Sequence, residues 1–452
     1  MDVFDVAVIG MGPGGEHVAG TLAEAGLRVL GVERALVGGE CPYWGCVPTK
    51  MMVRAADALA EARRVPQLAG STGVVVPDWA PVAARIRAEA TDTWDDTVAA
   101  DRFVGKGGVL VRGAGRVLSP TEFTVGDTRY AVRRGIVVAT GSSPAVPPIP
   151  GLAEVGYWTN HDLVEATTLP EALVILGGGA IGCELGQVVA RFGVRVGIVE
   201  AAPRLLPLEE PQAGTLLADV LTEQGVRVAV GVAAQQVTRA GSEVQVRLAD
   251  GSVVTGDRVL VATGRRVDVG GVGLPAVGVD PSARSVPVDE RCRVVDGVWA
   301  VGDVTGQGAF THVAMYQAGI VVRDILGQPG PPADYRAVAR VTFTDPEVGA
   351  VGLTEGQARE QLAHVQVGQT QVPSTARGWM HKVGNEGFIT LVADADRGVL
   401  VGATTMGPAG GEVLGALAVA VHAQVPLEVL RSMIYAYPTF HRGIEDALAA
   451  LR

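Results

Sequence analysis

The residues with the clearest chemical potential lie in the segment 38–50, GGECPYWGCVPTK. It holds Cys41 and Cys46, two of the chain's four cysteines, five positions apart beside glycines and prolines. A disulfide needs Cα atoms about 4.4–6.8 Å apart, and a regular helix would hold positions i and i+5 too far apart. Pro42 and Gly45 indicate that the backbone between the cysteines is not a regular helix. The spacing therefore suits a thiol pair that can close into a disulfide and open again.

We interpret this pair as a reversible redox dithiol rather than a structural crosslink or a zinc site. The stabilisation that a crosslink gives grows with loop length and is small for so short a ring. No histidine pair of zinc-ligand spacing accompanies the cysteines. The other two thiols, Cys183 and Cys292, stand alone in apolar surroundings and are expected to be buried and inert.

A dinucleotide-binding motif follows the first apolar segment, residues 4–9, which we expect to be a strand. The next residues satisfy G-x-G-x-x-G with Gly10, Gly12 and Gly15. The first glycine allows a tight turn, the second lets the backbone approach a pyrophosphate, and the third lets helix pack on strand. A second expected strand, 28–32, ends at Glu33. This carboxylate is placed to accept hydrogen bonds from a ribose, or it is a solvated surface charge.

The motif recurs later in the chain, again between an expected strand, 173–176, and a helix. Its glycines are Gly177, Gly179 and Gly182. Glu200 ends the following strand, as Glu33 does in the first motif. Two complete motifs imply two dinucleotides, or FAD plus a nicotinamide cofactor. Glu200 would repel a 2′-phosphate and favours NADH over NADPH; Arg204 is the counterargument, unless it is only a solvated charge.

The elements that must position these groups are those of an α/β fold. At 452 residues the chain is expected to hold about three domains. Its 48% hydrophobic residues, 61 glycines and only 5% aromatics favour compact α/β packing with many tight turns. Helices are expected from Lys50 to about Arg64, over 81–98, over 412–422 and over 439–451.

Charge and hydropathy exclude several classes of partner. The net charge of −11 argues against a nucleic-acid partner. No apolar stretch reaches transmembrane length, so no membrane partner is expected. The first ten residues carry acidic side chains where a signal peptide is basic. We therefore expect a cytoplasmic enzyme, a compartment in which a thiol pair is more often catalytic than structural.

Three further segments carry small or acidic residues at expected strand ends. Thr140 and Gly141 allow close approach of the backbone to a ligand. Gly302 and Asp303 suit a ribityl or pyrophosphate contact, although an ordinary turn cap would use the same residues. The Pro/Gly cluster at 328–332 marks the last domain boundary.

Together the two G-x-G-x-x-G motifs, GGECPYWGCVPTK, VWAVGDV and VTFTDPEVGAVGLTEGQA resemble the class I pyridine nucleotide-disulfide oxidoreductases across the whole chain. The resemblance implies two Rossmann-like domains, for FAD and NAD, plus a C-terminal α+β dimerisation domain. The implied bounds are 1–150 and 271–332 for FAD, 151–270 for NAD(P) and 333–452 for dimerisation. It also implies a homodimer in which the second subunit completes the active site for a small-molecule electron acceptor.

The resemblance also assigns roles to single residues. Cys46 is implied to be the thiol next to the flavin and Cys41 the thiol that attacks the acceptor, while Lys50 and Glu184 are an ion pair beside the flavin. The expected cofactor-contacting residues are Gly10, Gly12, Gly14, Gly15, Glu33, Gly39, Lys50, Thr140, Gly141, Gly177, Gly179, Ile181, Gly182, Glu200, Gly264, Gly302, Asp303 and Ala314. Residues 311–314 would begin a helix that points at the flavin ring.

One departure from the family pattern concerns proton transfer. Disulfide-reducing members carry His-Pro-Thr-x-x-Glu near the C-terminus, whereas this chain has Tyr437 in place of the histidine and Arg442 in place of the glutamate. A phenol titrates near 10 and is a poor base at neutral pH. His441 and Glu445, four apart, either form a displaced dyad on one helix face or are a solvent-facing pair.

The acceptor therefore stays open between a small disulfide and a non-disulfide acceptor such as a quinone or a soft metal ion. Dihydrolipoamide dehydrogenase, mercuric-reductase-like and transhydrogenase-like activities are the alternatives, and outside enzymes a redox sensor or a docked component of a multienzyme complex. Two further groups either border the acceptor or serve packing and the dimer surface. They are the pair Tyr43 and Trp44, and the cluster Arg377, Trp379 and His381.

Overall fold

The computed structural model describes residues 2–452 of the chain. They form two compact units. The first unit comprises the chain up to Pro48, Ala84–Ala145 and Arg265–Tyr335. The second comprises Thr49–Ala83, Val146–Gly264 and Arg336–Arg452. Each unit is therefore assembled from three separate stretches of sequence.

The first unit is built on a sheet with the strand order β16-β17-β6-β1-β2-β3, extended by the antiparallel strands β4 and β5. Strands β17, β6, β1, β2 and β3 are parallel to one another. The strands are β1 (Val3–Ile9), β2 (Val29–Glu33), β3 (Val109–Arg112), β4 (Gly115–Ser119), β5 (Glu122–Val125), β6 (Thr128–Val138), β7 (Ser143–Pro144), β15 (Arg265–Arg266), β16 (Arg293–Val295) and β17 (Val298–Ala300). The helices are α1 (Pro13–Glu24), α2 (Glu40–Tyr43), α5 (Thr97–Gly105) and α10 (Thr311–Leu326), with short turns η3 (Leu274–Val277) and η4 (Asp303–Thr305).

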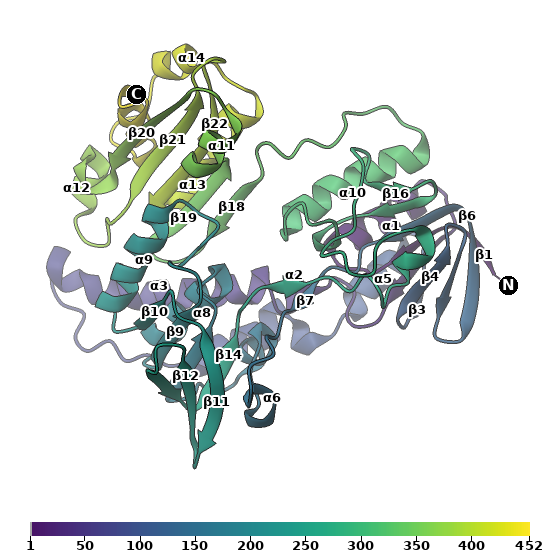
Figure 1. Cartoon of the computed structure of the whole chain (residues 1–452), viewed down its shortest axis with the longest axis horizontal. Coiled ribbons are helices and arrows are strands. Elements are labelled where there is room, and N and C mark those ends of the chain that lie inside the picture. Colours follow the sequence, from purple (N-terminus) through teal and green to yellow (C-terminus); the bar gives the residue numbers. More distant parts are fainter. Residues whose placement is uncertain (1) are drawn as a thin grey trace. The chain divides into compact units, whose positions relative to one another are not determined.

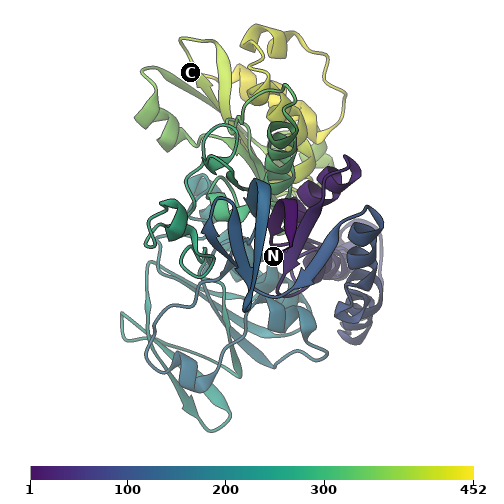
Figure 2. The same ribbon diagram turned by 90° about the vertical axis from the view of Figure 1, so that its right-hand side faces the viewer.

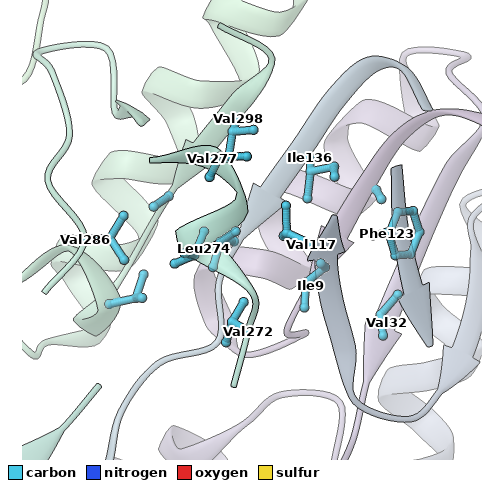
Figure 3. Packing of buried hydrophobic residues seen from close by; sticks show 14 of the residues in the cluster. Ile9, Val32, Val117, Phe123, Ile136, Val272, Leu274, Val277, Val286 and Val298 are labelled. Atoms are coloured by element: carbon cyan, nitrogen blue, oxygen red, sulfur yellow. The ribbon is translucent and has the colours of Figure 1, made fainter. Parts of the chain in front are cut away.

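Both faces of this sheet are covered, which explains the continuous apolar runs of its strands. Helices α1 and α10 pack against one face, where their apolar residues join those of β1 and β2 in one core. The hairpin β4–β5 and the segment 267–288 cover the other face, where Phe123 and Leu274 are fully buried. Figure 3 shows this second core, with side chains from the sheet, the hairpin and η3 converging on one another. Figure 2 shows the blue strands of the hairpin and β6 beside the N-terminal strand β1.

The part of the second unit that comes before residue 265 repeats this plan on a smaller scale. Its parallel sheet has the order β10-β9-β8-β14, and a separate antiparallel sheet has the order β11-β12-β13. The strands are β8 (Ala172–Leu176), β9 (Arg195–Glu200), β10 (Arg227–Val230), β11 (Ala234–Ala240), β12 (Glu243–Leu248), β13 (Val253–Gly256) and β14 (Arg258–Val261). The helices are α3 (Cys46–Leu68), which begins in the first unit, α4 (Ala80–Arg85), α6 (Leu152–Val155), α7 (Asn160–Glu165), α8 (Ala180–Arg191) and α9 (Pro211–Glu223).

The C-terminal part of the second unit is a five-stranded antiparallel sheet of order β18-β19-β22-β21-β20. Helices α13, α14 and α15 share a core with one face of it, and Figure 1 shows α13 lying along the sheet in green to yellow. The strands are β18 (Ala339–Thr342), β19 (Glu347–Gly352), β20 (Val365–Gln371), β21 (Phe388–Asp394) and β22 (Val399–Gly407). The helices are α11 (Glu355–Gln361), α12 (Ala376–His381), α13 (Gly410–His422), α14 (Leu427–Ser432) and α15 (Gly443–Ala449), with the short turns η5 (Val372–Ser374) and η6 (Phe440–Arg442).

The expected α/β architecture is confirmed, whereas three of the expected helices differ from the structure. The helix expected over 439–451 is the turn η6 followed by α15, which ends at Ala449. The helix expected from Lys50 begins at Cys46, because Pro48 lies in its first turn, where proline is tolerated. The helix expected over 81–98 is broken into α4, a π turn η1 (Ile86–Ala90), a 3₁₀ turn η2 (Asp92–Trp94) and α5. Three consecutive residues, Asp92, Thr93 and Trp94, have positive φ and interrupt it. No helix within residues 2–452 combines the length and apolar character needed to cross a bilayer.

Candidate functional site

The two cysteines lie on either side of a break between two helices. Cys41 belongs to the single turn α2, and Cys46 is the first residue of α3. The turn closes through hydrogen bonds from the Trp44 and Gly45 N–H groups to the Glu40 carbonyl, at 2.9 and 2.7 Å. A Cβ atom at Gly45 would lie 3.0 Å from that carbonyl oxygen and 3.3 Å from the Cα of Cys41. Glycine at this position therefore avoids a tight contact where the backbone folds back between the cysteines.

The two thiols differ in their surroundings. A side-chain hydrogen bond with Cys46 and burial raise the pKa of the Cys41 thiol far above its ordinary value, while a hydrogen bond with Thr311 acts in the opposite direction. Cys46 is exposed and begins a long helix, where the helix dipole favours a thiolate. Its sulfur lies 3.5 Å from the Oγ1 of Thr311, the first residue of α10. The arrangement thus favours a thiolate at Cys46 and a protonated thiol at Cys41.

The remaining cysteines lie in the core. Both Cys183 and Cys292 have no exposed surface. Burial raises the pKa of the Cys183 thiol, whose sulfur donates to the Gly178 carbonyl at 3.3 Å. Burial also raises the pKa of Cys292 to about 11. Both side chains are therefore protonated and shielded, as expected from the sequence.

The first glycine motif forms a tight junction of β1, α1 and β6. Gly10 has φ +95°, and a Cβ atom there would lie 2.4 Å from the Ala139 carbonyl oxygen. A Cβ at Gly15 would lie 2.0 Å from the Gly10 carbonyl oxygen, which is why helix and strand can pack so closely. The Glu33 carboxylate at the end of β2 accepts hydrogen bonds from the N–H groups of Met11 and Ala35, at 2.7 and 2.8 Å.

The second motif reproduces this geometry in the other unit. Gly177 has φ +109°, and its Cβ would lie 2.3 Å from the Ala262 carbonyl oxygen, while a Cβ at Gly182 would lie 2.0 Å from the Gly177 carbonyl oxygen. Glu200 accepts from the N–H groups of Gly178 and Ala202, at 2.7 and 2.6 Å. Each expected carboxylate is therefore oriented by two backbone donors at the end of the second strand.

The middle glycine of each motif leaves room for a ligand. A Cβ at Gly179 would meet no atom within 4 Å, and one at Gly12 would meet only the Cα of Gly39, at 3.9 Å. The N-termini of α1 and α8 begin at these positions, and their N–H groups favour an anionic pyrophosphate. A bulkier residue at Gly39 is excluded because its Cβ would lie 2.8 Å from the Cα of Gly12. The residues of both motifs therefore fit a dinucleotide.

Other expected contact residues gather around the first motif. A Cβ at Gly14 would lie 3.2 Å from the Cβ of Ala314, so α10 packs directly on α1. Asp303, the first residue of η4, accepts a hydrogen bond from the Ser142 hydroxyl at 2.6 Å. Arg265 in turn donates to that hydroxyl at 2.7 Å and to the Ser142 carbonyl at 2.6 Å. Ser142 and Arg265 thereby orient the Asp303 carboxylate.

In the second unit, Lys50 and Glu184 form the expected ion pair. The Lys50 ammonium donates to Oε2 of Glu184 at 2.6 Å. The Glu184 side chain is 7% exposed and that of Lys50 is 36% exposed, so the carboxylate is shielded while the ammonium reaches solvent. Lys50 follows Cys46 by one turn of α3. Two other expected contact residues belong to the same unit. Ile181, on the same helix as Glu184, is 36% exposed. Gly264, the last residue of the stretch Val146–Gly264, has φ +108°.

The residues that replace the family's proton-transfer dyad contact one another. The Arg442 guanidinium lies 5.5 Å from the centroid of the Tyr437 ring, which is 64% exposed. Arg442 also pairs with the Glu445 carboxylate at 2.9 Å. Of the two alternatives for His441 and Glu445, the structure does not support a dyad on one helix face, because His441 belongs to the turn η6 and Glu445 to α15. Glu445 therefore has an arginine partner.

Two members of the cluster on α12, Arg377 and His381, contact the ring of Phe440. The Arg377 guanidinium lies 5.5 Å from the Phe440 ring centroid, and the His381 ring meets Phe440 edge to face at 5.7 Å. Burial lowers the pKa of His381. Trp379 is 67% exposed. Among residues 2–452 no group of three or more His, Cys, Asp or Glu side chains could hold a metal ion.

Sequence reasoning missed the side chains that orient these groups. The Thr311 hydroxyl beside both thiols, and Ser142 and Arg265 beside Asp303, carry no pattern of their own. Thr311 is 265 positions from Cys46 along the chain, and Arg265 is 123 positions from Ser142. Such contacts depend on which strands the topology places next to one another. The sequence placed Thr311 at the start of a helix, but it did not indicate that its hydroxyl contacts the thiols.

Comparison with known proteins places this geometry in a known group. Residues 4–318 match the family described as pyridine nucleotide-disulphide oxidoreductase, and residues 338–448 match its dimerisation domain. A dihydrolipoyl dehydrogenase of Chlorobaculum tepidum is 34% identical over 98% of this chain and 96% of its own. A mercuric reductase of Staphylococcus aureus is 31% identical over 99% of this chain and 82% of its own. The Cu(II) complex of HOCl-induced flavoprotein disulfide reductase RclA from Escherichia coli has a TM-score of 0.85, with 27% identity over 99% of both chains.

Proposed function

We propose a specific activity for this chain, which belongs to the pyridine nucleotide-disulphide oxidoreductase family. It is a flavoprotein enzyme of that family, and a homodimer is expected from its dimerisation domain. Our proposal is that NADH is the electron donor, that Cys41 and Cys46 are the redox-active pair, and that the acceptor is a small disulfide or a soft metal ion. A bound FAD supplies the hydride chemistry between the nicotinamide and the thiols.

The observation that carries this proposal is the asymmetry of the two thiols. Cys46 is favoured as thiolate by the start of α3, while the hydrogen bond with Cys46 and burial keep Cys41 protonated. Cys46 is thus suited to share electrons with the flavin, and Cys41 to attack an acceptor once it loses its proton. Thr311 supports both roles, since its hydroxyl hydrogen-bonds to either sulfur.

The division of the chain follows from this assignment. We assign FAD to residues 1–150 and 271–332, the nicotinamide cofactor to 151–270, and dimerisation to 333–452. The proposed FAD contacts include Glu33, Thr140, Gly141 and Asp303. A hydrogen bond from the Ser142 hydroxyl orients the Asp303 carboxylate. We also propose that the enzyme works in the cytoplasm, where a thiol pair is kept available for turnover.

A soft metal ion is retained as a second acceptor because of a specific observation. The family's histidine and glutamate are replaced by Tyr437 and Arg442, which contact each other through the ring. Reduction of a thiol-bound metal ion needs no general acid, because no thiolate leaves that would have to be protonated. The names of two similar proteins, mercuric reductase and the Cu(II) complex of RclA, are in keeping with such an acceptor.

The test of the proposed acceptor is turnover with NADH against a panel of small aliphatic disulfides, a benzoquinone, Cu(II) and Hg(II). We expect turnover with disulfides or with metal ions, and its loss when Cys41 is replaced by serine. Turnover with the quinone alone, unchanged in that variant, would contradict the proposal and favour direct transfer from the flavin.

The preference for NADH rests on Glu200. Its carboxylate is held by two backbone N–H groups and would repel a 2′-phosphate. Arg204, the possible phosphate ligand, donates instead to the Pro207 carbonyl at 3.0 Å within its own loop. We expect Glu200→Ala to lower kcat/KM for NADH about 10–100-fold, the equivalent of one hydrogen bond to a charged group, with little effect on NADPH. The matched control is Glu223→Ala, which removes an exposed acidic side chain at the end of α9. If Glu200→Ala leaves the ratio of kcat/KM for NADH to kcat/KM for NADPH unchanged, the assignment is contradicted.

The raised pKa of Cys41 predicts a pH dependence. Below that pKa the thiolate fraction rises about tenfold for each pH unit, and only the thiolate attacks a disulfide. We therefore expect the rate at which reduced enzyme is reoxidised by a small disulfide to rise continuously from pH 6 to pH 9. The control is the rate at which an outer-sphere electron acceptor, which needs no thiolate, reoxidises the reduced enzyme. Both rates are measured by stopped flow. A rate that is level between pH 6 and pH 8 would show that a base already activates Cys41.

A further inference from the structure

Within the second unit, polar contacts at three successive positions along α8 join this helix to α3 and to the segment 343–345. We call these positions levels, counted from Glu184 through Gln187 to Arg191. On α3 the residues involved are Lys50, Asp57 and Arg64, which are spaced by seven and therefore lie on one face. On α8 they are Glu184, Gln187 and Arg191. All three side chains on α8 are buried. The segment 343–345, just after β18, supplies the remaining partners.

Glu184 uses both carboxylate oxygens. Oε2 accepts from the Lys50 ammonium at 2.6 Å, and Oε1 accepts from the Phe343 N–H at 2.8 Å. The Phe343 ring also faces Lys50, whose nitrogen lies 4.7 Å from the ring centroid. The direction in which Glu184 presents its charge to Lys50 thus depends on where the backbone of Phe343 lies.

Gln187 holds that backbone in place. Its Oε1 accepts from the Asp345 N–H at 2.8 Å, and its Nε2 donates to the Asp345 carbonyl at 2.8 Å. This reciprocal pair mimics a step of a β-ladder and fixes the segment's distance from α8. Gln187 is 3% exposed, so water cannot replace these bonds readily.

The third level anchors the same segment by charge. The Asp345 carboxylate pairs with Arg191 at 2.5 Å and with Arg64 at 2.7 Å. Arg191, with a side chain only 5% exposed, also pairs with Asp57 at 2.6 Å. The two helices and the segment 343–345 are therefore joined at several points, of which Gln187 is the one nearest to Glu184 along α8.

We propose that Gln187 is a positioning residue: by binding the backbone of Asp345 it places the Phe343 N–H and ring so that Glu184 and Lys50 keep their pairing. Gln187 reaches neither thiols nor cofactor in this role and acts through Glu184. The inference rests on the proposed function only in taking Lys50 and Glu184 as part of the working site.

The sequence provides a direct way to test this. Lys50, Lys106 and Lys382 are its only lysines, so the reactivity of each amine can be mapped on separate peptides. Acetic anhydride reacts with an amine that is accessible and not engaged in an ion pair. In this structure the Glu184 carboxylate engages the Nζ of Lys50 at 2.6 Å. The rate of acetylation at Lys50 thus reports its pairing with Glu184.

We expect trace acetylation of the purified holoenzyme to be about two- to fivefold faster at Lys50 in Gln187→Leu than in wild type, the scale of losing a partly exposed ion pair, with Lys106 and Lys382 unchanged. Gln224→Ala is the matched control, because the exposed Gln224 side chain accepts a hydrogen bond from Gln187 Nε2 at 3.1 Å, whereas the backbone of Asp345 is bound by Gln187 itself. If Gln187→Leu does not fold, Gln187→Asn, one methylene shorter, replaces it.

Two outcomes would overturn the proposal. An unchanged rate at Lys50 would show that Glu184 keeps its place without Gln187. Faster acetylation of all three lysines would show general loosening rather than positioning. Neither result depends on the cysteines, so failure here is distinguishable from failure of the proposed dithiol chemistry.

Discussion

Replacement of either Cys41 or Cys46 by serine is expected to lower NADH-dependent reduction of a disulfide about 10,000-fold or more, the scale of loss when a nucleophile is removed. Cys41 attacks one sulfur of the acceptor and forms a mixed disulfide, and Cys46 then displaces the remaining thiol and closes the Cys41–Cys46 disulfide. Neither step has a substitute, because the only other cysteines in the sequence are Cys183 and Cys292, both fully buried.

The matched control for these variants is Cys183→Ala. It removes a thiol that donates only to the Gly178 carbonyl, and we expect turnover close to that of wild type. Assays should follow NADH consumption and release of acceptor thiols together. Consumption of NADH without release of thiols in Cys41→Ser would be consistent with electrons that reach the flavin and stop there. Full thiol release in either serine variant would contradict the assignment.

At two glycines of the second nucleotide motif, substitution by alanine is expected to affect the stability of the protein differently. A Cβ at Gly182 would lie 2.0 Å from the Gly177 carbonyl oxygen, so alanine must push α8 away from β8. We expect Gly182→Ala to lower the free energy of unfolding by about 3 kcal/mol or more. Thermal unfolding and NADH titration measure its two consequences, lost stability and lost binding.

Gly179→Ala is the partner experiment. Its Cβ would meet no atom within 4 Å, and the backbone has an ordinary φ of −77°. Stability should therefore be unchanged, while a methyl group at the place of the pyrophosphate should weaken NADH binding about 10–100-fold. FAD content should stay the same, because the first motif is untouched. Equal NADH affinity in wild type and Gly179→Ala would show that the nicotinamide cofactor does not bind at this motif.

The sequence was sufficient for those parts of the fold that depend on local constraints. Gly10 and Gly177 have positive φ beside a carbonyl oxygen, a combination that leaves glycine as the only fitting residue. Because such positions admit so few residue types, both nucleotide motifs and their carboxylates Glu33 and Glu200 could be located by spacing alone. The continuous apolar run of β8 likewise predicted a buried strand.

Contacts between distant segments could not be predicted in this way. The bonds from Gln187 to Asp345 and from Ser142 to Asp303 join residues 158 and 161 positions apart. Glutamine, serine and aspartate are common in many surroundings, so their types carry little information about a partner. The break between α4 and α5 was missed for a related reason: Asp92, Thr93 and Trp94 are compatible with a helix in isolation, and only their positive φ in the folded chain ends it.

The most direct test of the dithiol as electron relay is anaerobic reduction of the holoenzyme by NADH, followed by absorbance, in wild type and in Cys46→Ser. A thiolate next to the flavin gives a long-wavelength band, and we expect this band in wild type alone. Wild type should also take up one more two-electron equivalent than the variant, because the disulfide is reduced as well. If both proteins lose their visible absorbance alike, with the same NADH consumption and no such band, the cysteines are not part of the electron path.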